Sequence, residues 1–219
     1  MNWRKLSKKL WLRTTDNQME LNDNRADALK EIINIGVGRA ASTLNELLSS
    51  HIVLHVPSVN IYRESEFLES IKSDDSEKLS TVHLHFQGNL AGIALMAFPP
   101  GMAANLVAAV TEDDFDLIDF DSVRIATLCE IGNIILNGVT GSFANLLEQR
   151  LYYSLPQYRE DCIDNMLLSA GNDPDDLIVV MQAHFSTEEL SIEGDIMVLF
   201  EVTSFDSLFS IVDNFIDSI

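Results

Sequence analysis

Residues 27–59 read DALKEIINIGVGRAASTLNELLSSHIVLHVPSV, and a second copy of this stretch, ATLCEIGNIILNGVTGSFANLLEQRLYYSLPQY, occupies residues 126–158. At an offset of 99 residues, three positions of the first copy recur in the second without a gap: Glu31 with Glu130, Asn34 with Asn133, and Pro57 with Pro156. Three matches in one register indicate an internal duplication.

The spacing within the first copy predicts a helix with one polar side. At 3.6 residues per turn, four positions fall within about 60° of one another: Asp27, Glu31, Asn34 and Gly38. The opposite side is apolar, which is typical of a helix packed on a core: Leu29, Ile32, Ile33, Gly36, Val37 and Ala40. We therefore expect Glu31 and Asn34 to face solvent.

The second copy presents the same pair of polar groups. Glu130, Asn133 and Asn137 share one side with Ala126, and the other side is apolar: Leu128, Ile131, Ile135, Leu136 and Val139. One interpretation is a functional surface that the chain carries twice. The other is that these are ordinary solvated residues, which a duplicated fold inherits with the rest of its surface.

Both segments resemble the signature of the CheC family of chemotaxis phosphatases, which includes CheC, CheX and FliY. In that signature an Asp or Ser precedes a Glu by four positions, the Glu precedes an Asn by three, and a Pro follows the Asn by 23. Asp27, Glu31, Asn34 and Pro57 fit it throughout, and in the second copy only Ala126 departs from it. The resemblance is to the CheC type, in which both halves carry a site, and it extends from about residue 22 to the end.

This resemblance implies a phosphatase that hydrolyses the aspartyl phosphate of a CheY-like response regulator. Asn34 and Asn133 would each orient the attacking water, since a carboxamide both donates and accepts hydrogen bonds. Glu31 and Glu130 would each contact the active-site lysine of the regulator. The Mg²⁺ ion is expected on the regulator, so this chain would bind no cofactor or metal of its own.

Composition narrows the class of partner. The chain has 34 acidic against 14 basic residues, which argues against nucleic acid. A hydrophobic fraction of 47% predicts a packed core instead of disorder. Cys129 and Cys162 are the only cysteines and no secretory leader precedes them, so we expect a cytoplasmic protein.

The first twenty residues differ from the rest because they hold five of the basic side chains: Arg4, Lys5, Lys8, Lys9 and Arg13. We expect residues 1–20 to be a flexible leader. Contact of this short segment with a membrane is the less favoured alternative, and its apolar run is too short for a signal peptide or a transmembrane helix.

A single domain is expected over residues 21–219, with internal repeats at about 22–115 and 121–219. Each repeat reads as helix, strand, hairpin and helix. In the first repeat we expect a strand over 51–56 that ends at Pro57, a polar connection over 60–80 with at most one helical turn, hairpin strands over 81–86 and 91–98, and a helix over 101–110.

One such repeat would expose an apolar sheet face that a second copy can cover. The sequence therefore predicts an α+β fold with pseudo-twofold symmetry, an antiparallel sheet and two long surface helices. This agrees with the CheC-like fold that the resemblance implies.

Two alternatives belong to another class, the interaction module without catalysis. The middle domain of the flagellar switch protein FliM resembles this fold but lacks the Glu and Asn signature, and some CheC proteins bind the deamidase CheD. A FliY-like switch component would carry a further C-terminal domain, and we expect none here because the closing helix is followed directly by Ile219. No G-x-S-x-G or H-E-x-x-H pattern favours a conventional hydrolase. His83 and His85 are a possible metal pair without an evident third ligand.

The second motif lacks a polar group at its head, because Ala126 stands where the first has Asp27. We therefore expect Asn34→Ala to lower the rate of regulator dephosphorylation more than Asn133→Ala does. The rates of the two single variants check this. Equal losses, or a larger loss for Asn133→Ala, would show that Ala126 does not matter.

Overall fold

A computed structural model describes most of the chain: residues 23–71, 78–88, 90–99, 101–111, 120–161, 177–187, 190, 192–202 and 205–217. The predictions about the basic leader and about Cys162 lie outside these residues. The predicted outer bounds of the domain and of its two repeats stay predictions.

The first repeat begins with a long helix and ends with a short one. Its elements are α2 (Asp23–Leu48), β1 (Val53–Arg63), α3 (Glu64–Ile71), β2 (Leu79–Gly88), β3 (Ala91–Phe98) and α4 (Met102–Thr111). The predicted order is present, and β2 and β3 form the predicted antiparallel hairpin. The region expected to be a polar connection instead contains the end of β1 and the two-turn helix α3.

The second repeat follows the same order. Its elements are α5 (Phe120–Leu146), β4 (Leu151–Tyr153), β5 (Gln157–Asp161), β6 (Leu177–Thr187), β7 (Ile192–Val202) and α7 (Phe205–Asp217). Strands β6 and β7 form the second hairpin. The single strand of the first repeat, β1, corresponds here to two short strands.

The prediction that the first strand ends at Pro57 is wrong. Strand β1 continues to Arg63, and its pairing with β6 shifts register between His55 and Ser58. Proline cannot donate to a ladder, so it is tolerated at an irregularity on an edge strand. In the second repeat the break between β4 and β5 contains Pro156. Both prolines therefore interrupt strand pairing at the same place in the repeat.

All strand pairs are antiparallel, and the order across the sheet is β1-β6-β7-β3-β2-β4, with β5 also paired to β2. This order reads the same when the two repeats are exchanged. The first strand of each repeat pairs with the hairpin of the other, so the two repeats interlock. The topology thus has the expected pseudo-twofold arrangement, while the duplication itself stays a prediction.

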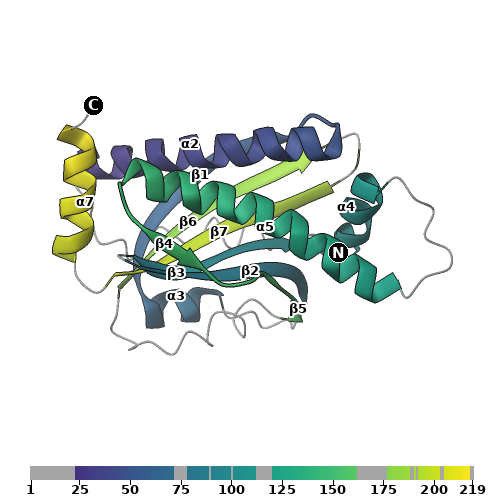
Figure 1. The fold of residues 1–219 in the computed structure, drawn as a ribbon. Helices are drawn as coiled ribbons and strands as arrows, with labels where there is room; N and C mark the ends of the chain where they lie inside the picture. Colours follow the sequence, from purple (N-terminus) through teal and green to yellow (C-terminus); the bar gives the residue numbers. More distant parts are fainter. Residues whose placement is uncertain are drawn as a thin grey trace.

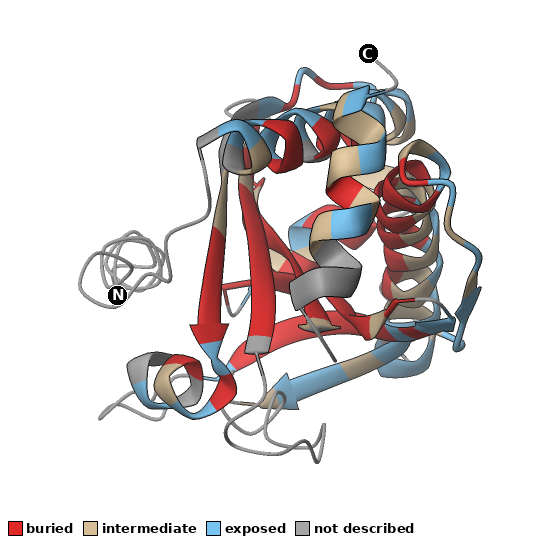
Figure 2. Ribbon diagram, turned by 90° about the vertical axis from the view of Figure 1, so that its left-hand side faces the viewer, coloured by how far each residue is buried: buried red, intermediate tan, exposed pale blue. Residues whose placement is uncertain are grey.

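Helices α2 and α5 run antiparallel on one face of the sheet, and α3 lies on the other face (Figure 1). Helix α7 packs against α2, and α4 packs against α5, so each closing helix contacts the leading helix of the other repeat. Buried residues are concentrated in the strands and on the sides of the long helices that face them (Figure 2).

The predicted apolar sides of both long helices are buried. In α2 these residues are Leu29, Ile32, Gly36, Val37 and Ala40. In α5 they are Leu128, Ile131, Ile135, Leu136 and Val139. Burial of a large aliphatic side chain contributes about 1.5–3 kcal/mol, so neither helix can rotate about its axis without losing several such contributions.

The helices approach closely where Gly36 of α2 meets α5. A Cβ atom at Gly36 would lie 3.2 Å from the carbonyl oxygen of Val139, and nearby the Arg39 side chain donates a hydrogen bond of 3.2 Å to Ser142 Oγ. The absence of a side chain at Gly36 therefore serves the close packing of the two helices. Gly38, by contrast, faces open space, because a Cβ atom added there would have no atom within 4 Å.

Gly132 and Gly138 of α5 provide a matched pair of substitutions. A Cβ atom at Gly132 would lie 2.4 Å from Val82 Cγ1, whereas at Gly138 it would meet nothing within 4 Å. We expect Gly132→Ala to destabilise the protein by about 1–3 kcal/mol through overpacking. Gly138→Ala should stabilise it by up to about 1 kcal/mol, because alanine favours a helix. Urea denaturation measures both values, and a neutral Gly132→Ala would show that α5 does not press on the sheet.

Candidate functional site

The first candidate pair lies on the outer side of α2. Glu31 and Asn34 are exposed, while Ile32 between them is fully buried. Asp27, one turn before Glu31, is also exposed and lies 3.4 Å from Lys30 Nζ. The buried side of the helix therefore fixes the direction in which the carboxylate and the carboxamide point. We call Glu31 and Asn34 site 1.

The second pair lies at the equivalent place on α5. Glu130 is exposed and Asn133 is half-buried, and Ile131 and Gly132 between them are buried against the core. Gly132 contacts Val82 of β2, which brings this turn of the helix directly onto the sheet. We call Glu130 and Asn133 site 2. The structure thus brings each predicted Glu together with its Asn, on the side of the helix that the periodicity predicted.

The two sites differ in one side-chain contact. In site 2, Asn137 Nδ2 donates a hydrogen bond of 2.7 Å to Asn133 Oδ1. In site 1 the equivalent position is Gly38, which has no side chain. Helical periodicity places Asn137 on the polar side, but this bond was not predicted. The signal was available, because polar side chains four residues apart on a helix are neighbours.

Both carboxylates are available to a cationic partner. Within the described part of the chain, neither Glu31 nor Glu130 forms an ion pair. An unpaired carboxylate on a fixed helix can accept a charge-assisted hydrogen bond from a lysine or an arginine of another molecule.

The two sites lie toward opposite ends of the helix pair. Gly36 of α2 contacts α5 at Val139 and Ser142, and the helices are antiparallel (Figure 1). At 1.5 Å per residue, Glu31 and Glu130 are then separated by about 25 Å along the helix axes. The two sites are therefore independent surfaces and cannot combine into one active centre.

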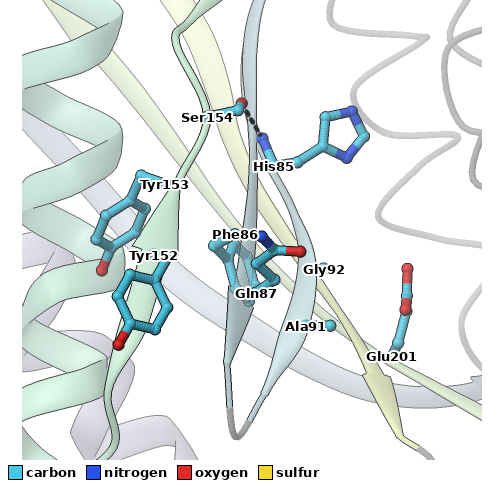
Figure 3. Close-up of a pocket in the computed structure, with 9 residues that line it drawn as sticks. All are labelled: His85, Phe86, Gln87, Ala91, Gly92, Tyr152, Tyr153, Ser154 and Glu201. Carbon is cyan, nitrogen blue, oxygen red and sulfur yellow. Dashed lines mark hydrogen bonds between the residues drawn. The ribbon is translucent and has the colours of Figure 1, made fainter.

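A pocket of about 360 Å³ opens elsewhere, beside the edge strand β4 (Figure 3). Its lining includes Tyr152 and Tyr153 on one side and Glu201 on the other, and the His85 amide donates a hydrogen bond of 3.0 Å to Ser154 Oγ. None of its lining residues belongs to site 1 or site 2. The candidate sites lie on the outer sides of two helices, and such a surface suits a macromolecular partner.

The start of α2, six residues before Glu31, is bound to α7. Arg25, which precedes Asp27 on α2, makes two hydrogen bonds to Asp213 of α7, at 2.8 and 2.6 Å. Its guanidinium also lies 4.2 Å from the ring centre of Phe209. The hydrogen bond from Arg25 lowers the pKa of Asp213, and the same bond raises the pKa of Arg25. The equivalent Arg124 contacts Asp121 and Glu160 instead.

Among the described residues, no group of three potential ligands could hold a metal ion. His83 and His85 lie close together, with ring centres 5.9 Å apart, and burial lowers the pKa of His83. His184, which the repeat aligns with His85, contacts Asp195 at 3.0 Å.

In the same described part of the chain, no helix combines the length and the apolar character that crossing a membrane requires.

Comparison with known proteins agrees with the site motif. A model of the CheC-like family matches residues 25–61, which include Asp27, Glu31, Asn34 and Pro57. A protein of Bacillus subtilis named CheY-P phosphatase CheC is 25% identical over 197 residues, which are 86% of this chain and 94% of that protein. The predicted resemblance to the CheC family is confirmed.

Solved structures share the CheC-like fold. Thermotoga maritima FliY superposes with a TM-score of 0.68 at 19% identity, over 92% of this chain and all of that chain. CheX in a complex with CheY, BeF₃ and Mg²⁺ from Borrelia burgdorferi gives 0.50 at 18% identity, over 80% and 98%. The FliM middle domain of H. pylori gives 0.55 at 13% identity, over 88% and 99%. The predicted α+β fold is therefore confirmed.

The Arg25–Asp213 pair predicts a pH-dependent brace. Because the pKa of Asp213 is lowered from its ordinary value of 3.8, its contribution to stability is present above that pH and is lost as pH falls through the lowered value. We expect Asp213→Asn to lower the melting temperature at pH 7, and the difference from the parent to shrink below pH 4. Asp217→Asn, which removes an exposed carboxylate of the same helix, is the matched control. A constant difference between pH 7 and pH 3 would contradict the assignment.

Proposed function

We propose that this chain is a cytoplasmic phosphatase that hydrolyses the aspartyl phosphate of a CheY-like response regulator. The observation that carries the proposal is the Glu and Asn pair on the outer side of each of two helices whose opposite sides are buried. The Bacillus subtilis relative is itself named a CheY-P phosphatase, and the Borrelia burgdorferi neighbour is a complex with CheY.

The carboxamides of Asn34 and Asn133 position the nucleophile. A carboxamide accepts a hydrogen bond from water through its oxygen and donates through its nitrogen, so it can hold one water in line with the phosphorus atom. The transition state of phosphoryl transfer is loose, and an aspartyl phosphate is an activated acyl phosphate. Positioning can therefore supply most of the acceleration, and no general base is required of this chain.

The carboxylates of Glu31 and Glu130 fix the register of docking. A carboxylate placed near a phosphoryl group repels it unless a cation lies between them, and the active-site lysine of the regulator supplies that cation. Both Glu side chains are exposed. A charge-assisted contact that is desolvated on docking is strong and directional, and it aligns the neighbouring Asn with the phosphate.

The Mg²⁺ ion of the reaction belongs to the regulator in this proposal. Residues of the regulator would hold the ion, and it would offset the negative charge of the phosphoryl oxygens. The open shape of sites 1 and 2 supports this division, because the deep, charged part of the joint active site is then contributed by the substrate protein. The phosphatase adds one water-positioning group and one docking group.

An interaction module without catalysis is the second candidate, and the fold similarity to the FliM middle domain favours it. Such a module would use the helix surface or the sheet edge for binding alone, to a flagellar protein or to CheD. The phosphatase is favoured because the Glu and Asn signature is present in both repeats. The two candidates differ in whether the amide side chains are needed for turnover.

Removal of both carboxamides tests the phosphatase. We expect Asn34→Ala/Asn133→Ala to lower the dephosphorylation of Bacillus subtilis CheY at least about 100-fold, since misplacing a reactant costs this much. The measurement is the decay of ³²P-labelled CheY phosphate with Mg²⁺, with and without the chain. Asn105→Ala is the matched control, because Asn105 is an exposed asparagine of α4 and lies on neither of the two long helices.

The control variant should keep the parent rate. Full activity of Asn34→Ala/Asn133→Ala, or decay no faster with the parent chain than in buffer, would refute the proposal. Binding of CheY phosphate that persists without any acceleration of its decay would favour the interaction module.

A further inference from the structure

The position one helical turn after the catalytic asparagine distinguishes the two sites. In site 2 it is Asn137, whose amide nitrogen lies 2.7 Å from Asn133 Oδ1. In site 1 it is Gly38, around which a side chain would have open space. The repeats are otherwise alike at this turn, with a buried apolar side and an exposed Glu.

The direction of this hydrogen bond follows from how the Asn137 amide is placed. Side chains on a helix lean toward its N-terminus, so Asn137 leans over the turn that carries Asn133. Its oxygen, Oδ1, is buried and has no hydrogen-bond partner among the described residues. Its NH₂ group is the end that engages the Asn133 oxygen.

This contact holds the Asn133 carboxamide along the helix instead of away from it. Asn133 is half-buried, whereas the equivalent Asn34 is exposed. To accept a water in the active site of another protein, the Asn133 oxygen must project from the helix and face a different direction. One of its two acceptor directions is already taken by Asn137.

We propose that Asn137 is a positioning residue that restrains the Asn133 carboxamide and thereby makes site 2 the slower of the two sites. The inference rests on the proposed phosphatase function. It differs from the effect expected of Ala126, because it acts on the carboxamide itself and not on the head of the motif.

The expected change in kcat follows from the net free energy of one hydrogen bond. Release of Asn133 from Asn137 must occur before the water is positioned, and the net contribution of such a bond corresponds to a factor of about two to ten in rate. The cost falls on kcat, because the carboxamide acts in the transition state. Docking through Glu130 does not require the release, so KM changes little.

The first test isolates site 2 in an Asn34→Ala background. Removing the restraint with Asn137→Ala should raise kcat for Bacillus subtilis CheY phosphate about two- to tenfold and leave KM unchanged. In an Asn34→Ala/Asn133→Ala background the same substitution should give no gain, because nothing is left to release. An unchanged or lower kcat in the first background, or a gain in the second, would overturn the inference.

The second test transplants the restraint into site 1, in an Asn133→Ala background. Gly38→Asn should lower kcat about two- to tenfold relative to Gly38→Ala. The alanine variant is the reference because it adds the Cβ atom and the helix preference without the amide. Equal kcat values for Gly38→Asn and Gly38→Ala would contradict the inference even where Asn137→Ala fails to fold.

These outcomes are distinct from failure of the proposed function. The proposed function fails when Asn34→Ala/Asn133→Ala retains the parent activity. The inference about Asn137 alone is refuted when that double variant is inactive and each single-site protein is active, but the Asn137 and Gly38 substitutions leave kcat unchanged.

Discussion

The burial of α2 and α5 on one face of a shared sheet is the constraint on which the rest of the structure depends. Each helix contributes a continuous apolar side to the core, and Gly36 lets the two backbones approach closely. Because the inner sides are fixed by packing, the outer sides are fixed as well. The Glu and Asn pairs are therefore held by the hydrophobic core and do not require hydrogen bonds of their own to face outward.

Periodicity was sufficient to predict the long helices, their buried sides and the hairpins, because these depend on residues close in sequence. It failed where the structure depends on contacts between segments that are far apart in the sequence. Pro57 reads as a strand end, yet β1 continues past it because β6 pairs with both parts of the strand. The exchange of first strands between repeats, and the contact of Arg25 with Asp213, join residues far apart in the chain and left no local pattern. In the candidate sites, the side of each helix was predictable. The spacing of Asn133 and Asn137 made a contact between them possible, but the bond itself depends on side-chain rotamers.

The open shape of the sites has consequences for selectivity. A phosphatase with a deep pocket selects its substrate by the fit of a phosphorylated residue. Here the chain offers helix surfaces held in place by the core, and the protein as a whole carries a net formal charge of −20. Recognition must then come from the match between two protein surfaces, and the acidity disfavours anionic partners by long-range repulsion.

The exchange of first strands also makes the folding of each repeat depend on the other. Strand β1 completes the hairpin of the second repeat, and β4 and β5 complete that of the first. Cutting the chain between the repeats would leave each with an unpaired sheet edge, so we regard the whole as one cooperative unit. Because each repeat needs the strands of the other, a repeat that lost its Glu and Asn pair would still be required for the other repeat to fold. The fold thereby permits one surface to diverge toward a new partner while its twin keeps the original task.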